Sequence, residues 1–185
     1  MLEPTQRGAL KAKRNPTTPE AFIVLPLIRI ISGGQTGADQ GALIAAKYLG
    51  LETGGMAPKG FRTDEGMNLD LGRIYGLIQC TSSAYQPRTR NNVATSDGTI
   101  LFGDLHSRGT HLTENLCIEF KKPAIRILWP YQEATPSIML RTAFINWLAI
   151  NNIETLNVAG NRERINPGIQ QAIEDFLINT LQGRV

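Results

Sequence analysis

Short apolar runs alternate with longer segments in which apolar residues recur at helical spacing, and this rhythm continues from residue 27 to residue 181. Runs rich in β-branched residues predict buried strands, whereas apolar positions repeated at i, i+4 and i+8 predict amphipathic helices. Strands are predicted at residues 27–32, 73–80, 99–103, 124–129 and 155–159, with a short strand or a turn at 54–57. Helices are predicted at residues 37–49, 110–121, 136–150 and 166–181, with a short helix whose first residue is Pro87. Strands that alternate with helices predict an α/β protein, a three-layer α/β/α domain with a mainly parallel sheet.

Residues 1–26 break this rhythm and predict an irregular N-terminal extension. The segment is polar and contains Pro4, Pro16 and Pro19, and Pro26 separates it from the first predicted strand. The rest of the chain, residues 27–185, has the size of a single domain with one continuous core. We therefore expect one ligand-binding domain, to whose core residues 1–20 add nothing.

The composition is typical of a globular protein of the cytoplasm. Apolar residues make up 42% of the 185, but no apolar run approaches the ~20 residues that a membrane helix needs. The first 20 residues also lack the apolar core of a signal peptide. Cys80 and Cys117 form no C-x-x-C pair, as expected of reduced cysteines buried in a core. We therefore expect a cytoplasmic protein with no membrane partner.

The charge is concentrated in the extension. Of the net charge of +3, residues 1–20 contribute +2 through four basic and two acidic side chains. A nucleic-acid-binding face needs clustered basic residues with interleaved aromatic ones, and the domain itself carries only +1. We therefore expect no nucleic-acid partner.

A glycine-rich turn lies between the first predicted strand and the helix at 37–49, with glycines at 33, 34 and 37. A strand, a tight turn and a helix N-terminus in that order predict an anion site, because the first helical N–H groups have no acceptor inside the helix. The turn is not a P-loop, since Ala38 and Asp39 follow Gly37 where Lys and Ser or Thr belong. A dinucleotide site is disfavoured as well, because Ser32 stands at the first glycine of G-x-G-x-x-G. The alternative is a tight packing corner.

Arg88 and Asn92 are the strongest candidates for ligand contact outside this turn. They lie four residues apart and share one face of the predicted helix. The planar arginine fork matches a phosphate, whereas the alternative is a solvated surface pair. As an exposed residue on a helix face, Arg88 is expected to contribute little to the core. Asp39 is predicted to stabilise the helix N-terminus, with contact to a ribose hydroxyl or a divalent ion as the alternative.

Several further polar residues allow either a site role or a structural one. Asp97 and Thr99 fit a turn before a strand as well as they fit a site. Glu65 is a candidate general base or hydroxyl acceptor, or an exposed loop acid. His106 and His111 flank the loop before the helix at 110–121, but their spacing supplies no third ligand, so we expect no metal site.

Five motifs occur in an order that resembles the molybdenum-cofactor carrier family. They are Gly33-Gly34-Gln35-Thr36-Gly37-Ala38-Asp39; Pro58-Lys59-Gly60 with Glu65-Gly66; Arg88-Thr89-x-x-Asn92-Val93-x-x-Ser96-Asp97-Gly98-Thr99; Gly109-Thr110-x-Leu112-Thr113; and Leu156-Asn157-Val158-Ala159-Gly160. The resemblance covers residues 28–182 and extends to the lysine-decarboxylase-like and cytokinin-activating phosphoribohydrolases. It implies a Rossmann-like fold, a homo-oligomer, and a phosphorylated ligand that is the molybdenum cofactor or a nucleotide.

Our leading hypothesis is a protein that binds this ligand without chemistry, a carrier rather than an enzyme. The ligand-binding residues that the resemblance implies, together with the glycine turn, are Gly33, Gly34, Gln35, Thr36, Gly37, Asp39, Lys59, Glu65, Arg88, Asn92, Asp97, Thr99, Gly109, Thr110 and Thr113. The alternative is cleavage of the N-glycosidic bond of a nucleoside monophosphate. Against it, Thr113 stands where the phosphoribohydrolases carry a glutamate, and Glu114 comes one position late. Glu65 or Asp97 is the substitute carboxylate that this alternative would need.

Overall fold

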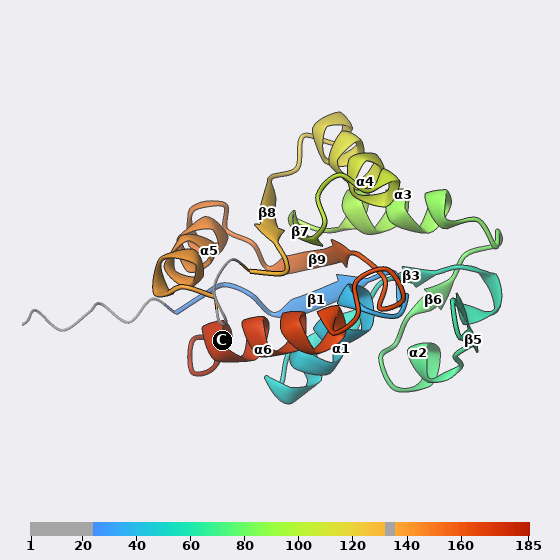
Figure 1. Ribbon diagram of the computed structural model, residues 1–185, viewed down its shortest axis with the longest axis horizontal. Coiled ribbons are helices and arrows are strands. Elements are labelled where there is room, and N and C mark those ends of the chain that lie inside the picture. The colour runs from blue at the N-terminus through green and yellow to red at the C-terminus, as the bar shows by residue number, and fades with distance from the viewer. Residues whose placement is uncertain (1–23, 132–135) are drawn as a thin grey trace, which may run out of the picture.

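Five parallel strands form the central sheet of the computed structural model, which describes residues 24–131 and 136–185 (Figure 1). The strands are β1 (Arg29–Ser32), β2 (Glu52–Gly54), β7 (Gly98–Gly103), β8 (Ala124–Leu128) and β9 (Thr155–Gly160). Their order across the sheet is β2-β1-β9-β7-β8. The predicted α/β fold with a parallel sheet is therefore confirmed. The predicted extension lies almost wholly outside the described residues.

The central strand of the sheet is the last one in the chain. β9 pairs in parallel with β1 on one side and with β7 on the other, so that Leu156 lies between Ile30 and Gly98. Counted from β9, the order becomes 3-2-1-4-5, which is that of a doubly wound sheet. The amide of Leu25 donates to the carbonyl of Arg184 at 2.8 Å, so the two ends of the domain meet. The chain is thus a circular permutation of that order. The strands are all parallel, but successive strands are added in opposite directions on the two sides of the boundary between β9 and β7, which is the switch point of the sheet.

Helices cover both faces of the sheet (Figure 1). The helices are α1 (Ala38–Tyr48), α3 (Tyr85–Thr95), α4 (Arg108–Glu119), α5 (Ile138–Ile150) and α6 (Ile169–Leu181). α1 and α6 pack together on one face with α5 beside α6, and their core includes the fully buried Phe102, Phe144 and Phe176. α3 and α4 cover the other face with Val93 and Cys117. This arrangement gives the three predicted layers.

A smaller subregion follows β2 and packs on α1 through Leu43, Phe61, Leu71 and Leu77. It consists of β3 (Met56–Ala57), the 3₁₀ turn η1 (Lys59–Phe61), β4 (Arg62–Thr63), β5 (Gly66–Met67), α2 (Asp70–Arg73) and β6 (Ile78–Gln79). The strand predicted at 73–80 is wrong over most of its length. The amide of Ile74 donates to the Asp70 carbonyl and that of Leu77 to the Leu71 carbonyl, so helical bonding and a turn precede β6.

Two helices begin earlier than predicted. α3 begins at Tyr85, so Pro87 is its third residue rather than its first. The missing N–H of proline costs little there, because the first four helical amides have no intrahelical acceptor. α4 begins at Arg108, where Ser107 caps it by accepting from the amide of Thr110 at 3.2 Å.

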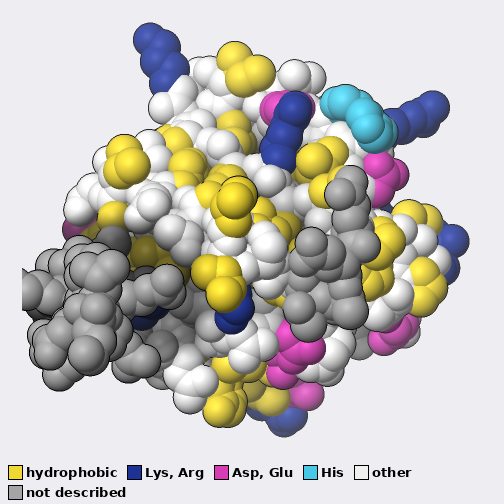
Figure 2. Space-filling model, turned by 60° about the vertical axis from the view of Figure 1, so that its left-hand side comes forward, with side chains coloured by type: hydrophobic (Ala, Val, Ile, Leu, Met, Phe, Trp, Pro, Cys, Tyr) yellow, Lys and Arg dark blue, Asp and Glu magenta, His cyan; other side chains and the backbone are white. Residues whose placement is uncertain are grey.

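Exposed apolar side chains are spread over the surface. Figure 2 shows one side of the molecule, where hydrophobic side chains are scattered over the face and charged side chains lie mostly around its rim. Ile138 and Met139 at the start of α5 are 75% and 81% exposed. No helix in the described part of the chain is long and apolar enough to span a membrane. The homo-oligomer implied by the resemblance stays a prediction.

The contact between α1 and α6 gives a test of this packing. A Cβ at Gly41 would lie 2.2 Å from the carbonyl oxygen of Gln170 in the first turn of α6. We expect Gly41→Ala to lower the free energy of unfolding by about 1–3 kcal/mol, because backbone atoms must shift. Gly109→Ala is the control, since a Cβ there meets only Ser107 Oγ at 3.9 Å and a helical alanine adds up to about 1 kcal/mol. Urea unfolding measures both, and equal effects would contradict the packing described.

Candidate functional site

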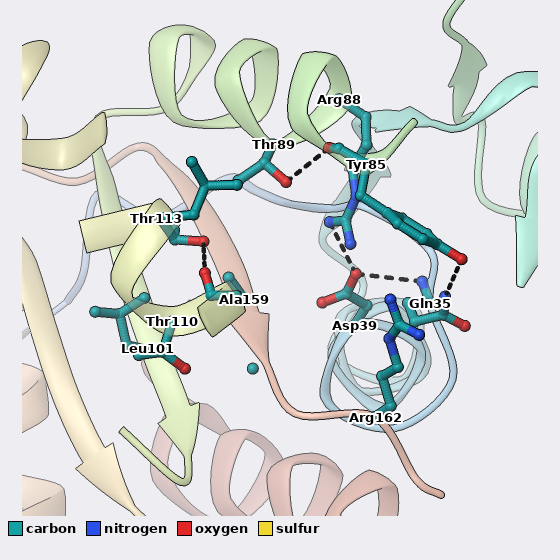
Figure 3. A pocket seen from close by; sticks show the side chains of 13 residues that line it. Gln35, Asp39, Tyr85, Arg88, Thr89, Leu101, Thr110, Thr113, Ala159 and Arg162 are labelled. Carbon is teal, nitrogen blue, oxygen red and sulfur yellow. Dashed lines mark hydrogen bonds and ion pairs between the residues drawn. The ribbon is translucent and has the colours of Figure 1, made fainter. Parts of the chain in front are cut away.

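A pocket of about 110 Å³ lies at the carboxyl ends of β9 and β7, where the sheet order reverses (Figure 3). α3, the N-terminal turns of α1 and α4, and the loop after β9 surround it. Its lining residues are Gln35, Asp39, Tyr85, Arg88, Thr89, Leu101, Gly109, Thr110, Leu112, Thr113, Ala159, Gly160 and Arg162. Ligands of doubly wound sheets bind at this position. The pocket brings together six of the predicted site residues: Gln35, Asp39, Arg88, Gly109, Thr110 and Thr113.

The amides of the glycine turn are paired within the protein. The amide of Gly34 donates to Ser32 Oγ at 3.2 Å, and that of Gln35 donates to Asp39 Oδ2 at 3.2 Å. The next three amides donate to Gln35 Oε1 at 2.9 Å, Gln170 Oε1 at 3.4 Å and the Asn161 carbonyl at 3.1 Å. An anion bound directly to this turn would have to displace these acceptors.

The glycines of the turn allow close packing. A Cβ at Gly33 would lie 1.6 Å from Arg88 Nη1, so the guanidinium occupies that space. A Cβ at Gly37 would lie 2.5 Å from the amide nitrogen of Glu163. The turn therefore fits against α3 on one side and against the loop after β9 on the other. This is the packing corner that the sequence left open as an alternative.

Asp39 and Arg88 form a buried ion pair in the pocket wall. Arg88 Nη1 lies 3.2 Å from Asp39 Oδ2, and the two side chains are 13% and 4% exposed. Burial raises the pKa of Asp39, against the opposing effects of Arg88, the amides of Gln35 and Gly33, and Arg162. Asp39 lies in the first turn of α1, where it accepts from the amide of Gln35 and holds Arg88. The prediction that Arg88 is an exposed residue that contributes little to the core is wrong.

Gln35 joins the glycine turn to two other segments. Its Oε1 accepts from the amide of Asp64 at 2.8 Å, and its Nε2 donates to Tyr85 Oη at 3.2 Å. Asp64 belongs to the turn between β4 and β5, and Tyr85 begins α3. The side chain is only 3% exposed, so these bonds are shielded from water. Gln35 therefore fixes the edge of the pocket rather than projecting into solvent.

Arg162 provides a second cation on the same side of the pocket (Figure 3). Its Nη1 donates to Asp64 Oδ1 at 2.7 Å, and its guanidinium lies 4.6 Å from the centroid of the Tyr85 ring. The guanidinium of Arg88 lies 5.8 Å from the same ring. Tyr85 thus holds both arginines through cation–π contacts. The Nε of Arg88 is buried without an acceptor among the described residues.

The opposite wall consists of hydroxyl groups and the N-terminus of α4. The hydroxyls of Thr89 and Thr113 donate to carbonyls one turn earlier, at 3.0 Å each, and keep their remaining lone pairs free to accept. Thr110 Oγ1 lies 3.1 Å from the Asp104 carbonyl. Gly109 leaves the first turn of α4 uncovered, since a Cβ there would meet only Ser107 Oγ. The Thr110 amide already donates to Ser107 Oγ, so this wall offers an anion the positive end of α4 and the helix amides that precede Thr110.

The remaining predicted site residues lie outside the pocket lining. Asn92 pairs with the backbone of Met56, accepting from its amide at 2.7 Å and donating to its carbonyl at 3.2 Å. Asp97 lies before β7, at the opposite edge of the sheet, and accepts from the amide of Thr155 at 2.7 Å. Thr99 accepts from the amide group of Asn157 at 3.2 Å inside the core. The other predicted residues that do not line the pocket are Gly33, Gly34, Thr36, Gly37, Lys59 and Glu65.

Sequence reasoning missed Tyr85, Thr89, Arg162 and Asp64. Tyr85 lies three residues before Arg88, the spacing of one helix face, but the predicted helix began only at Pro87. Thr89 shares a face with Tyr85, four residues earlier, rather than with Arg88. Arg162 follows the carboxyl end of a predicted strand, where ligands bind in such sheets. Asp64 had no local signal, because only the fold brings it to Gln35 and Arg162.

The carboxylates considered for hydrolysis do not enter the pocket. Glu114 forms an ion pair with Arg126 on β8, and Glu65 is exposed in the turn between β4 and β5. Asp39 is the sole carboxylate among the lining residues of the described chain, and it is paired with Arg88. The described residues contain no group of three or more His, Cys, Asp or Glu placed to hold a metal ion.

Comparison with known proteins identifies a family and a similar structure. Residues 30–181 match the circularly permutated YpsA SLOG family. A crystal structure from Syntrophus aciditrophicus, of a protein described as a "putative molybdenum carrier protein", is 35% identical with a TM-score of 0.77. The similarity covers 85% of this chain and 96% of that one. No curated protein matches the chain.

The buried ion pair predicts a stability effect that depends on pH. Arg88→Ala leaves Asp39 without its nearest counter-ion, which we expect to lower the free energy of unfolding by about 3–5 kcal/mol near neutral pH. A carboxyl group with a raised pKa contributes its full stability below its ordinary pKa and loses it as the pH rises through the raised value. Removing Arg88 raises the pKa of Asp39 further, so the deficit shrinks in acid. Urea unfolding at several pH values measures it.

Asp39→Asn in the Arg88→Ala background is the control for this effect. The double variant contains no buried charge, so we expect it to regain part of the lost stability and to lose the pH dependence. A deficit that is the same at every pH, or that the second substitution leaves unchanged, would show that the pair is not responsible.

Proposed function

The chain belongs to the circularly permutated YpsA SLOG family, and we propose that it binds a small phosphorylated ligand, either the molybdenum cofactor or a nucleotide-like molecule. In this proposal the phosphate group occupies the pocket between Arg88, Arg162 and the N-terminus of α4. The similar Syntrophus protein is described as a molybdenum carrier, which supports a carrier role without chemistry. A homo-oligomer belongs to the proposal through the family resemblance alone, and a cytoplasmic location through the two cysteines, whose spacing is that of reduced core residues.

One observation carries this proposal. Two arginines and an uncovered helix N-terminus face the same small cavity from opposite walls. Charge-assisted hydrogen bonds from arginine and the amides of a helix N-terminus are the groups with which proteins bind phosphate. The buried Nε of Arg88 lacks an acceptor among the described residues, and an oxygen of a bound anion would supply one.

The volume of the pocket favours a phosphate group over a whole cofactor. Pockets that enclose a complete small molecule have volumes of about 300–1,000 Å³. The cavity here measures about 110 Å³, so the organic part of the ligand extends beyond it. Its lining residues include neither Cys80 nor Cys117 and offer no thiolate ligand to molybdenum. The residues present therefore fit the phosphate arm of a cofactor and would not ligate its metal.

Gly109 offers a direct test, because it lines the pocket and has room for a side chain. We expect Gly109→Asp to weaken binding of guanosine monophosphate and of the molybdenum cofactor by about tenfold or more, since the new carboxylate repels the phosphate. Folding should be preserved, because an acidic residue in the first turn of a helix is stabilising. Isothermal titration calorimetry measures the affinities.

Gly109→Asn is the matched control, with the same shape and no charge. We expect it to bind both ligands within a few-fold of the unaltered protein. Equal losses in the two variants would indicate a steric effect. Full binding by Gly109→Asp would place the phosphate elsewhere and refute this location.

A further inference from the structure

A carboxylate lies in the wall of the pocket that we propose for an anion. The side chain of Asp39 is 4% exposed, and its Oδ2 accepts from Arg88 Nη1 and from the amide of Gln35, each at 3.2 Å. Figure 3 shows the other carboxylate oxygen directed toward the side of the pocket that Thr113 and Ala159 form. An anion in this pocket therefore meets a negative charge as well as two positive ones.

The charged groups around Asp39 come from two elements. Arg88 faces it from α3, and Arg162 faces it from the loop after β9. Tyr85 is the one other titratable residue among the described residues that line the pocket. Asp64 pairs with Arg162, so each arginine already has a carboxylate partner. The pocket therefore offers little excess positive charge to a ligand that is fully deprotonated.

A carboxylate can accept hydrogen bonds but has no hydrogen to donate. Beside Asp39, an oxyanion without a proton places two acceptors and two negative charges against each other. An oxyanion that carries a proton instead donates a short, charge-assisted hydrogen bond to the carboxylate. The difference in binding between these two kinds of oxyanion therefore depends on the proton and not on the size of the anion.

We propose that Asp39 is a specificity-determining residue that selects oxyanions bearing a proton. Inorganic phosphate keeps at least one proton near neutral pH, and a phosphate monoester keeps one in its monoanion, whose share grows as the pH falls toward its second pKa of about 6. Sulfate and molybdate carry none. This inference rests on the proposed function and narrows it. Molybdenum reaches this site within a phosphorylated ligand, and free molybdate is rejected.

The proton balance determines how binding varies with pH. A phosphate that already carries a proton shares it with Asp39, and no further proton is required. Sulfate can bind only after Asp39 takes up a proton from solvent, for which burial has already raised the pKa of this residue. The affinity for sulfate should therefore rise as the pH falls, by up to about tenfold per pH unit. The affinity for phosphate should change less over the range in which phosphate keeps a single proton.

Titration calorimetry of the full chain with inorganic phosphate, sulfate and molybdate tests this selection. We expect phosphate to bind at least about tenfold more tightly than either of the other two, because the hydrogen bond to a charged group is lost with them. Asp39→Asn replaces one carboxylate oxygen by an NH₂ donor, so the variant should lose this preference or reverse it. Asp64→Asn is the matched control: it removes the carboxylate of the other arginine and should keep the preference for phosphate.

Each outcome decides the inference. Equal affinity of the unaltered protein for phosphate and molybdate would overturn it, as would an unchanged preference in Asp39→Asn. If Asp39→Asn does not fold, the pH series on the unaltered protein decides, and parallel profiles for phosphate and sulfate would overturn the inference. If the protein binds guanosine monophosphate but binds phosphate, sulfate and molybdate equally well, this inference fails and the proposed function stands. If the protein binds none of these ligands, both the proposed function and this inference are wrong.

Discussion

The site depends on the constraint that a buried carboxylate needs a cation beside it. Asp39 is held at the start of α1 with Arg88 as its nearest counter-ion, and the arginine reaches it across the space left by Gly33. This contact, together with the hydrogen bond from Gln35 to Tyr85, holds α3 against the first strand–helix connection. Tyr85 and Thr89 are placed by the same helix, and Tyr85 in turn lies against Arg162. The ion pair therefore helps to shape the pocket wall, and the selectivity proposed for the pocket follows from the carboxylate of Asp39, which accepts hydrogen bonds and has none to donate.

The permuted chain order leaves the site intact. A ligand at the switch point of a doubly wound sheet contacts the carboxyl ends of neighbouring strands, and their spatial order matters more than their order in the chain. Here β9 comes last and still occupies the centre, because the two ends of the domain meet at Leu25 and Arg184. The loop after β9 thereby brings Arg162 to the same pocket as the turn after β1.

Much of the fold could be predicted from local pattern, and less of the site. The strand–helix rhythm and the glycine turn are local features, and they gave the sheet and the position of α1 correctly. The bonds of Asp64 to Gln35 and Arg162 join residues 29 and 98 positions apart, and no local pattern encodes them. Asn92 shows the opposite case: its helix face was predicted, but its amide group pairs with the backbone of Met56. The glycines showed a tight turn, whereas only the surrounding structure shows that its amides already have acceptors.

The location of the phosphate is the central claim, and a crystal structure tests it most directly. Crystals grown without sulfate and soaked with guanosine monophosphate would show the position of the bound group. The structure described here predicts phosphate density between Arg88, Arg162 and the first turn of α4, with the amides of the glycine turn still bonded to their protein acceptors. Phosphate density against the amides at residues 33–37, with nothing between the two arginines and α4, would contradict it.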